Sequence, residues 1–152
     1  MRIYLPSTLA ELAHPDGLGP RVVHAVTPAL RAALPDEDDE GLEYAAQLLA
    51  ADDSVDRLAE APTSWRRVVV AADVPDDAVS AIAGDGEVAS AVQLLAMVRW
   101  SEVACAHVDE AAAEADVRAA AEGDDAAAEA LVERDLLWFD VSELPGLARS
   151  AR

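Results

Sequence analysis

The sequence predicts an α+β protein, with a mixed sheet of about five strands and helices mainly on one face, in a ferredoxin-like arrangement. Residues 68–72 are small or β-branched apolar residues between a basic pair and Asp73, which is typical of a strand buried on both faces. Residues 42–61 keep apolar residues three or four positions apart, which is typical of an amphipathic helix. A three-layer α/β arrangement is the alternative.

The other elements of the first half are short. We expect strands at residues 2–5 and 21–27, and a brief helix after Thr27, a residue that caps a helix well when proline follows it. The acidic run at residues 36–40 is expected to be a solvated entry to the long helix, which ends at Pro62. After the central strand we expect a minor extended piece at residues 79–82 and a turn at Gly84-Asp85-Gly86.

The second half is expected to hold a hairpin, two helices and a last strand. Residues 91–98 and 103–108 are apolar runs joined by a short connection, which favours a hairpin. An alanine-rich helix then begins at Asp109 and ends at Gly123, and a short helix follows to about residue 133. The last strand is expected at residues 136–141, and the last few residues are expected to fray. We predict one domain over residues 1–152.

The charge balance limits the classes of partner. The chain has 30 acidic and 11 basic residues, for a formal net charge of −19, and every base is an arginine. Because proteins that bind the nucleic-acid backbone need clustered basic residues, we expect no nucleic-acid partner and no anionic membrane partner. No apolar run approaches the roughly 20 residues of a membrane span. The single cysteine, Cys105, has no partner for an internal disulfide, and we expect a cytoplasmic protein.

Six phrases of the sequence carry a family resemblance: RIYLP, HAVTPAL, LEYAA, RVVVAADVP, VACAHVDE and LLWFDV. In this order they resemble a family of small uncharacterised actinobacterial proteins, classified only as a domain of unknown function. The resemblance covers nearly the whole chain. It implies one compact domain in an actinobacterial cytoplasm. The chain has no lysine, which either the codon bias of a GC-rich genome or a salt-adapted surface would explain, and the resemblance favours codon bias. It implies no activity and no catalytic residue.

Four residues stand at or near the ends of predicted strands: Asp73, His107, Asp109 and Asp140. If the strands are parallel, these side chains would meet at one edge of the sheet. His107 and Asp109 are two residues apart, so an extended backbone would direct both to one face. With Asp73 they would hold a divalent metal, or act as a base with its orienting carboxylate. In an antiparallel arrangement they would be caps, turn acids and a hydrogen-bonded histidine.

The remaining reactive or aromatic residues fit structural roles. The chain lacks the glycine-flanked serine of acyl transfer, the phosphate-binding glycine loops and any Cys-x-x-Cys, so no cofactor is expected. Cys105 is expected to be a small core residue, and His24 a half-buried strand residue. The three tryptophans, Trp65, Trp100 and Trp138, lie at strand boundaries, where they either close the ends of the core or form a contact surface for another protein.

Two classes of function remain open on the sequence. The first is a non-catalytic interaction or regulatory protein, with a protein partner or a homodimer, which fits the acidic surface and the missing motifs. The second is a small metal-dependent or acid/base enzyme with its site at the carboxyl edge of the sheet. The enzyme requires that Asp73, His107, Asp109 and Asp140 converge in one concave pocket.

Overall fold

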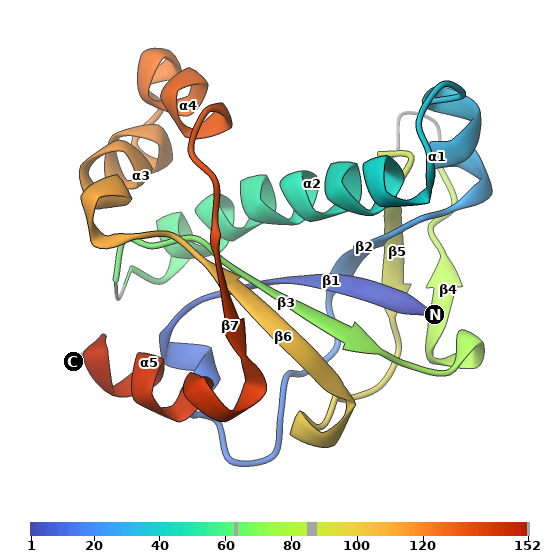
Figure 1. The fold of residues 1–152 in the computed structure, drawn as a ribbon, viewed down its shortest axis with the longest axis horizontal. Helices are drawn as coiled ribbons and strands as arrows, with labels where there is room; N and C mark the ends of the chain where they lie inside the picture. The colour runs from blue at the N-terminus through green and yellow to red at the C-terminus, as the bar shows by residue number, and fades with distance from the viewer. Residues whose placement is uncertain (63, 85–87, 152) are drawn as a thin grey trace.

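The computed structural model describes residues 1–62, 64–84 and 88–151, which form a seven-stranded antiparallel sheet with five α-helices (Figure 1). The strands are β1 (Arg2–Ser7), β2 (Val22–Ala25), β3 (Val68–Asp73), β4 (Val79–Ala81), β5 (Ala91–Leu94), β6 (Val103–Val108) and β7 (Leu137–Asp140). The helices are α1 (Pro28–Ala33), α2 (Asp39–Glu60), α3 (Glu114–Ala121), α4 (Asp125–Val132) and α5 (Leu144–Ser150), with a 3-10 turn, η1, at Ala10–Ala13.

The α+β class is confirmed, but the sheet is larger than predicted and is not mixed. Its order is β4-β5-β2-β1-β3-β6-β7, and every neighbouring pair is antiparallel. β1 lies between β2 and β3, and the chain crosses from β2 to β3 through α1 and α2. β2, the two helices and β3 thus form a split β-α-β unit, which ferredoxin-like sheets also contain. The turn predicted at Gly84-Asp85-Gly86 has its last two residues outside the described ranges.

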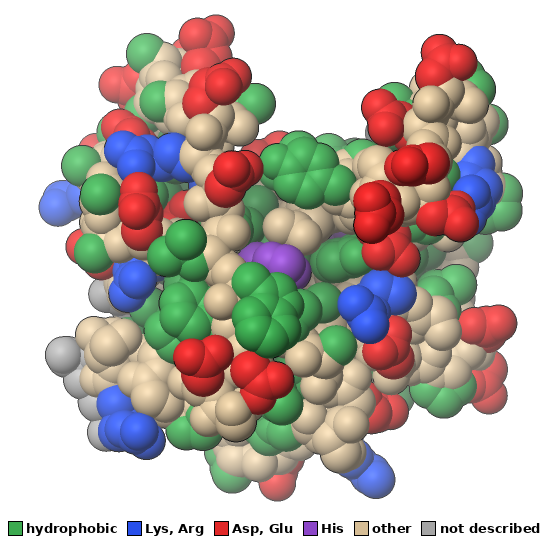
Figure 2. Space-filling model, viewed as in Figure 1, with side chains coloured by type: hydrophobic (Ala, Val, Ile, Leu, Met, Phe, Trp, Pro, Cys, Tyr) green, Lys and Arg blue, Asp and Glu red, His purple; other side chains and the backbone are tan. Residues whose placement is uncertain are grey.

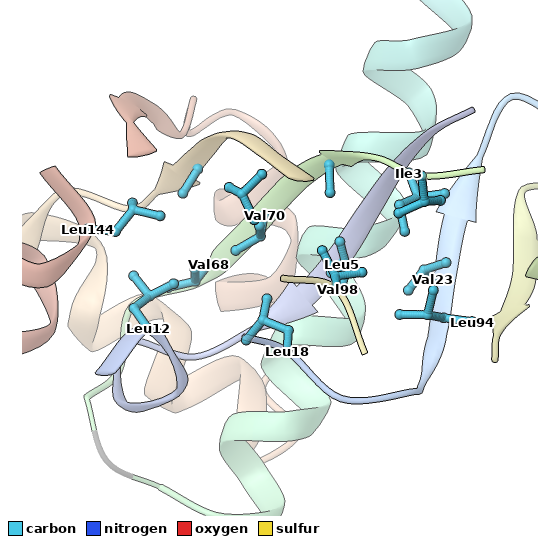
Figure 3. Close-up of a cluster of buried hydrophobic side chains, with 14 of the residues drawn as sticks. Ile3, Leu5, Leu12, Leu18, Val23, Val68, Val70, Leu94, Val98 and Leu144 are labelled. Atoms are coloured by element: carbon cyan, nitrogen blue, oxygen red, sulfur yellow. The ribbon is translucent and has the colours of Figure 1, made fainter. Parts of the chain in front are cut away.

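The predicted hairpin between residues 91–98 and 103–108 is wrong. β5 pairs with β2 and β4, whereas β6 pairs with β3 and β7, so the two strands lie in opposite halves of the sheet. The connection between them crosses one face instead of turning tightly. Val98, on this connection, is 1% exposed and is bridged to Leu18, and both lie in the core of that face (Figure 3). The connection therefore contributes Val98 to the core.

Each face of the sheet has its own core because successive side chains point to opposite sides of a strand. On one face Ile3, Leu5, Val68 and Val70 contact η1, the Leu18 segment and α5 (Figure 3). On the other face Tyr4, Val69 and Ala71 pack against α2. The helices are mainly on one face, as predicted, except that α5 covers the opposite face.

Helix α2 begins three residues before the predicted start, because Asp38 accepts a hydrogen bond from the Gly41 N–H, 2.9 Å, and caps it. Its middle is tied to the sheet by Ser54, which is 0% exposed. The Ser54 hydroxyl donates to the Ser7 carbonyl, 2.7 Å, and accepts from the Val68 N–H, 3.0 Å. A small polar residue on the buried stripe of α2 thus connects β1 with β3.

Glu11 on η1 provides a pH-dependent tie to α2. Its carboxylate pairs with Arg57 at 2.6 Å and with Arg21 at 3.0 Å. Burial opposes ionisation of the Glu11 carboxyl, but the hydrogen bonds from Arg21 and Arg57 outweigh it, so the pKa of Glu11 lies below its ordinary value of 4.5. The stability linked to Glu11 is therefore present above about pH 4.5 and is lost as the pH falls through the lower pKa of the folded state.

We expect Glu11→Gln to lower the free energy of unfolding at pH 7 by on the order of 1.5–3 kcal/mol, because two charge-assisted hydrogen bonds are weakened. The difference from the wild type should shrink as the pH falls below 4.5, the ordinary pKa of the carboxyl. Urea unfolding at neutral and acidic pH measures both values, with the exposed Glu129→Gln as control. A difference that is the same at both pH values would contradict the ion-paired role of Glu11.

Candidate functional site

Asp109 lies at the opposite end of β3 from Asp73, and its carboxylate is bound elsewhere. Because β6 is antiparallel to β3, the end of β6 lies beside the start of β3, whereas Asp73 stands at the other end of β3. Asp109 is buried, and its carboxylate accepts from the Arg67 Nε, at 2.8 Å, from its Nη2, at 2.9 Å, and from its backbone N–H, at 2.9 Å. Asp109 is therefore half of a buried ion pair, and its oxygens are already occupied.

Asp73, His107 and Asp140 lie on one face of the sheet, around Cys105. Asp140 is directly opposite Cys105 in the β6–β7 register, and His107 is two residues along β6. The Cys105 Sγ and the His107 Nε2 are 3.6 Å apart. Asp73 faces the same side and binds Arg2, with its Oδ1 2.8 Å from the Arg2 Nε. Within the described residues, no three His, Cys, Asp or Glu side chains are grouped closely enough to hold a metal ion.

The charge states of Cys105 and His107 differ from those of a cysteine nucleophile and its base. Burial raises the pKa of the Cys105 thiol, which is 6% exposed as the sequence predicts for a core residue. Burial, and then the charge of Arg2, lower the pKa of the His107 imidazole. At neutral pH the pair is a thiol beside a neutral imidazole, whereas a cysteine nucleophile needs the thiolate beside an activating base or cation.

The two carboxylates beside this pair have partners of their own. The hydrogen bond from Arg2 holds the pKa of Asp73 below its ordinary value. Hydrogen bonds from the Ser142 hydroxyl and backbone lower the pKa of Asp140 in the same way. Both carboxylates therefore remain ionised at neutral pH, and neither is a proton donor.

The same face of the sheet carries an exposed tryptophan. Trp138 lies opposite His107 on β7, and its side chain is 60% exposed. Tyr44 on α2 is 49% exposed, and its hydroxyl donates to Asp135, 3.4 Å, just before β7. Figure 2 shows a histidine (purple) in a hollow of this side of the molecule, between apolar side chains (green) and with charged groups on the rim. We call Tyr44, His107 and Trp138 the Trp138 surface.

The other two tryptophans belong to the core. Trp65 is partly buried beside the cluster at the end of α2, with the Arg118 guanidinium 6.0 Å from its ring centroid. Trp100 is packed against the main core, and its indole N–H donates to the His14 carbonyl, 2.8 Å. The alternative roles predicted for the tryptophans therefore divide: two close the core and Trp138 remains exposed.

Sequence reasoning missed a hydrogen-bonded serine, histidine and aspartate. The His24 ring nitrogens lie 2.7 Å from the Ser90 hydroxyl and 2.8 Å from the Asp53 carboxylate. A hydrolase triad needs an accessible serine and a buried aspartate. Here Ser90 is 0% exposed and the Asp53 side chain is 43% exposed, so the order of burial is reversed. The group connects β2 with α2 and with the start of β5, and no local spacing in the sequence signals it.

Comparison with known protein families assigns the chain to a family. A model described as a family of unknown function (DUF6912) matches residues 1–148. The chain belongs to this family. No curated protein and no solved structure matches it. The DUF6912 match confirms the resemblance to a domain of unknown function, and it carries no activity or ligand.

Among the helices in the described part of this DUF6912 protein, none has the length and apolar character to cross a membrane.

Proposed function

We propose that the protein is a non-catalytic binding protein that holds an extended basic segment of another protein against β7. The observation that carries the proposal is Trp138, 60% exposed on a strand that ends the sheet. Tryptophan is among the residues most enriched at the energetic centres of protein interfaces. An indole that lies in water on an edge strand gains most when a partner covers it.

The backbone of β7 supports pairing with another strand. The Asp140 N–H donates to the Glu143 carboxylate, 2.8 Å, and so is directed away from β6. Because the hydrogen-bonding pairs of an antiparallel ladder alternate, Trp138 also directs its N–H and C=O to the open edge. β7 contains neither the lysine nor the proline that protect many edge strands. A segment added there gains main-chain hydrogen bonds, while Trp138 supplies side-chain contact.

Charge favours a basic partner over a second copy of the chain. Four carboxylic acids stand beside or within β7: Glu133, Asp135, Asp140 and Glu143. The base in this stretch, Arg134, is paired with Glu110 at 3.2 Å and with Asp116 at 3.1 Å. A homodimer through β7 would bring two sets of these acids together, on chains of formal charge −19. Arginine or lysine beside the pairing residues of a partner would complement them.

The setting we propose is a single domain in an actinobacterial cytoplasm, with neither nucleic acid nor membrane as partner. The excess of acids supports the exclusion of both, since a phosphate-rich surface would be repelled. The buried free Cys105 fits a reducing compartment. The six phrases quoted above support the actinobacterial setting.

A small enzyme is the second candidate, supported by the 3.6 Å separation of the Cys105 Sγ and the His107 Nε2. Its metal-dependent form predicts stabilisation by a divalent ion. We expect none of Mn²⁺, Zn²⁺, Mg²⁺ and Ca²⁺ to raise the melting temperature of chelator-stripped protein, because Asp73 and Asp140 are held by Arg2 and Ser142. A rise of several degrees that His107→Ala abolishes would contradict this expectation and favour the enzyme.

Peptide selection from a random display library tests the binding proposal. We expect the wild type to enrich peptides in which arginine or lysine alternates with apolar residues, because these match both the edge and its charge. Trp138→Ser should lower the affinity for the selected peptides by about tenfold or more, as expected for a residue at the centre of an interface. Added salt should weaken binding as well, because exposed charge pairs are screened.

The matched control is Leu95→Ser, since Leu95 is 55% exposed and follows β5 in the other half of the sheet. Peptides that bind Trp138→Ser as tightly as the wild type, or that show no enrichment of basic residues, would contradict the proposal. Sedimentation of the protein alone decides about the homodimer. A dimer that Trp138→Ser dissociates would assign the surface to a second copy instead.

A further inference from the structure

A second hollow lies on the opposite face of the sheet, between η1 and α5, which lie side by side at one end of the molecule (Figure 1). It is an open cavity of about 580 Å³. Its walls include Leu12, Trp100, Val141 and Leu144. Small-molecule sites in proteins have volumes of roughly 300–1,000 Å³ and mainly apolar walls, so the size and the lining both suit a small ligand.

The apolar walls are held in place by the core. Leu12 is 4% exposed and Leu144 is 2% exposed, and both belong to the core cluster on this face of the sheet. Trp100 is fixed from two sides, by packing on that cluster and by the hydrogen bond from its indole N–H to the His14 carbonyl, 2.8 Å. A ligand that enters therefore meets side chains that are already ordered, which lowers the entropic cost of binding.

One arginine stands at the rim of this cavity. Arg149 lines it and is exposed, and it forms no ion pair with a carboxylate of the described residues. Most arginines of this acidic chain do form such pairs. They are Arg2, Arg21, Arg31, Arg57, Arg67, Arg118 and Arg134. An arginine that forms no ion pair within the described residues, and that stands beside an apolar cavity, offers its fork of N–H donors to a carboxylate.

His14 adds a second polar group to the lining. Its Nδ1 accepts a hydrogen bond from the Asp16 N–H, 3.3 Å, so the proton of the neutral ring lies on Nε2. The imidazole therefore offers a donor on its other side. Among the described residues, the lining thus combines an apolar body with a cation and an imidazole N–H donor, and it includes no carboxylate.

We propose that this cavity binds a small amphipathic carboxylate, with an aromatic or branched aliphatic body against Leu12, Trp100 and Leu144 and its carboxylate on Arg149. The net charge of −19 favours an anion at this place, because most of the surface repels an anion and Arg149 forms no ion pair within the described residues. The site is on the opposite face from the Trp138 surface. It goes beyond the binding of a partner at β7, and it stands or falls independently of that binding.

Titration with 4-phenylbutyrate, followed by the indole N–H signal of Trp100 in NMR spectra, tests the site. We expect a saturable shift of this signal, while the signal of Trp138 stays in place. The neutral 4-phenylbutanamide has the same apolar body without the charge, and its affinity should be lower by about tenfold or more. Arg149→Gln should reduce the affinity for the carboxylate to that for the amide, and should leave the affinity for the amide unchanged.

The matched control is Arg99→Gln, because Arg99 is exposed, is next to Trp100 in the chain and does not line the cavity. It should leave the affinity for 4-phenylbutyrate unchanged. A titration without saturation at the Trp100 signal would overturn the proposal. Equal affinities of wild type and Arg149→Gln for the carboxylate would also overturn it, and since both substituted residues are exposed, both variants should fold.

Discussion

Asp109→Ala should lower the free energy of unfolding by about 3–5 kcal/mol, the cost of leaving one charge of a buried ion pair without its partner. The side chains of Arg67 and Asp109 are 3% and 1% exposed. The variant leaves the Arg67 Nε and backbone N–H, which both donate to Asp109, without an acceptor in the interior, and leaves its Nη2 with only the Arg134 carbonyl, 3.3 Å away. Urea unfolding at neutral pH, followed by circular dichroism, measures the loss.

Two controls make the Asp109 result specific. Asp77→Ala removes an exposed acid and should change the stability by less than about 0.5 kcal/mol. The double variant Arg67→Met/Asp109→Leu should recover part of the loss, because it removes the unpaired charge but leaves the Arg67 backbone N–H without its acceptor. Wild-type stability of Asp109→Ala would mean that this carboxylate is not needed for the fold. It would return Asp109 to the candidate site residues.

Leu144→Ala should lower the free energy of unfolding by about 2–5 kcal/mol, the cost of removing a large side chain from a packed core. Leu144 is 2% exposed and lies in the cluster that η1 and α5 share with the sheet. The loss should be accompanied by faster proteolysis within α5, because this helix is held by few buried residues. Urea unfolding and limited proteolysis measure the two effects.

The control for Leu144 is Leu95→Ala, since Leu95 is 55% exposed and should cost less than about 0.5 kcal/mol. If Leu144→Ala has the stability of the wild type, α5 does not contribute to the core. That result would support the frayed tail expected from the sequence and would remove a wall of the cavity beneath α5.

The elements with a strong local pattern were predictable. The uninterrupted apolar run at residues 68–72 predicts β3, and the regular apolar spacing at residues 42–61 predicts α2 apart from its first turn. α5 was missed for a local reason as well. Pro145 and Gly146 resemble a stop signal, but proline is also favoured in the first turn of a helix, and Leu144 and Ala148 are four residues apart on the buried side.

Strand pairing was not predictable, because the alternation of side chains indicates the buried face of a strand and not its neighbour. The short link between residues 91–98 and 103–108 favoured a hairpin, and only the burial of Val98 in the core shows why the chain crosses the sheet there. The direction of β6 depends on the same long-range packing. This direction separates Asp109 from Asp73, although each stands at the end of its own strand.

The candidate site was predictable where two residues share a strand. Cys105 and His107 are two apart on β6 and lie on one face, as the period of a strand requires. The exposure of Trp138 depends on the position of β7 at the edge of the sheet, which the sequence of β7 does not contain. The connection of His24 with Asp53 and Ser90 joins segments far apart in the chain, so it is visible only in the folded molecule.

Hydrogen exchange of the β7 backbone amides tests the central proposal, the addition of a partner strand at this edge. The probe is a basic peptide obtained by selection on the wild-type protein, and the observable is the exchange rate of the Trp138 amide with and without it. We predict slower exchange of this amide in the complex, because its N–H gains a backbone acceptor, and no change at the Asp140 amide, which Glu143 already holds. Tight binding with an unchanged Trp138 amide would contradict strand addition at β7.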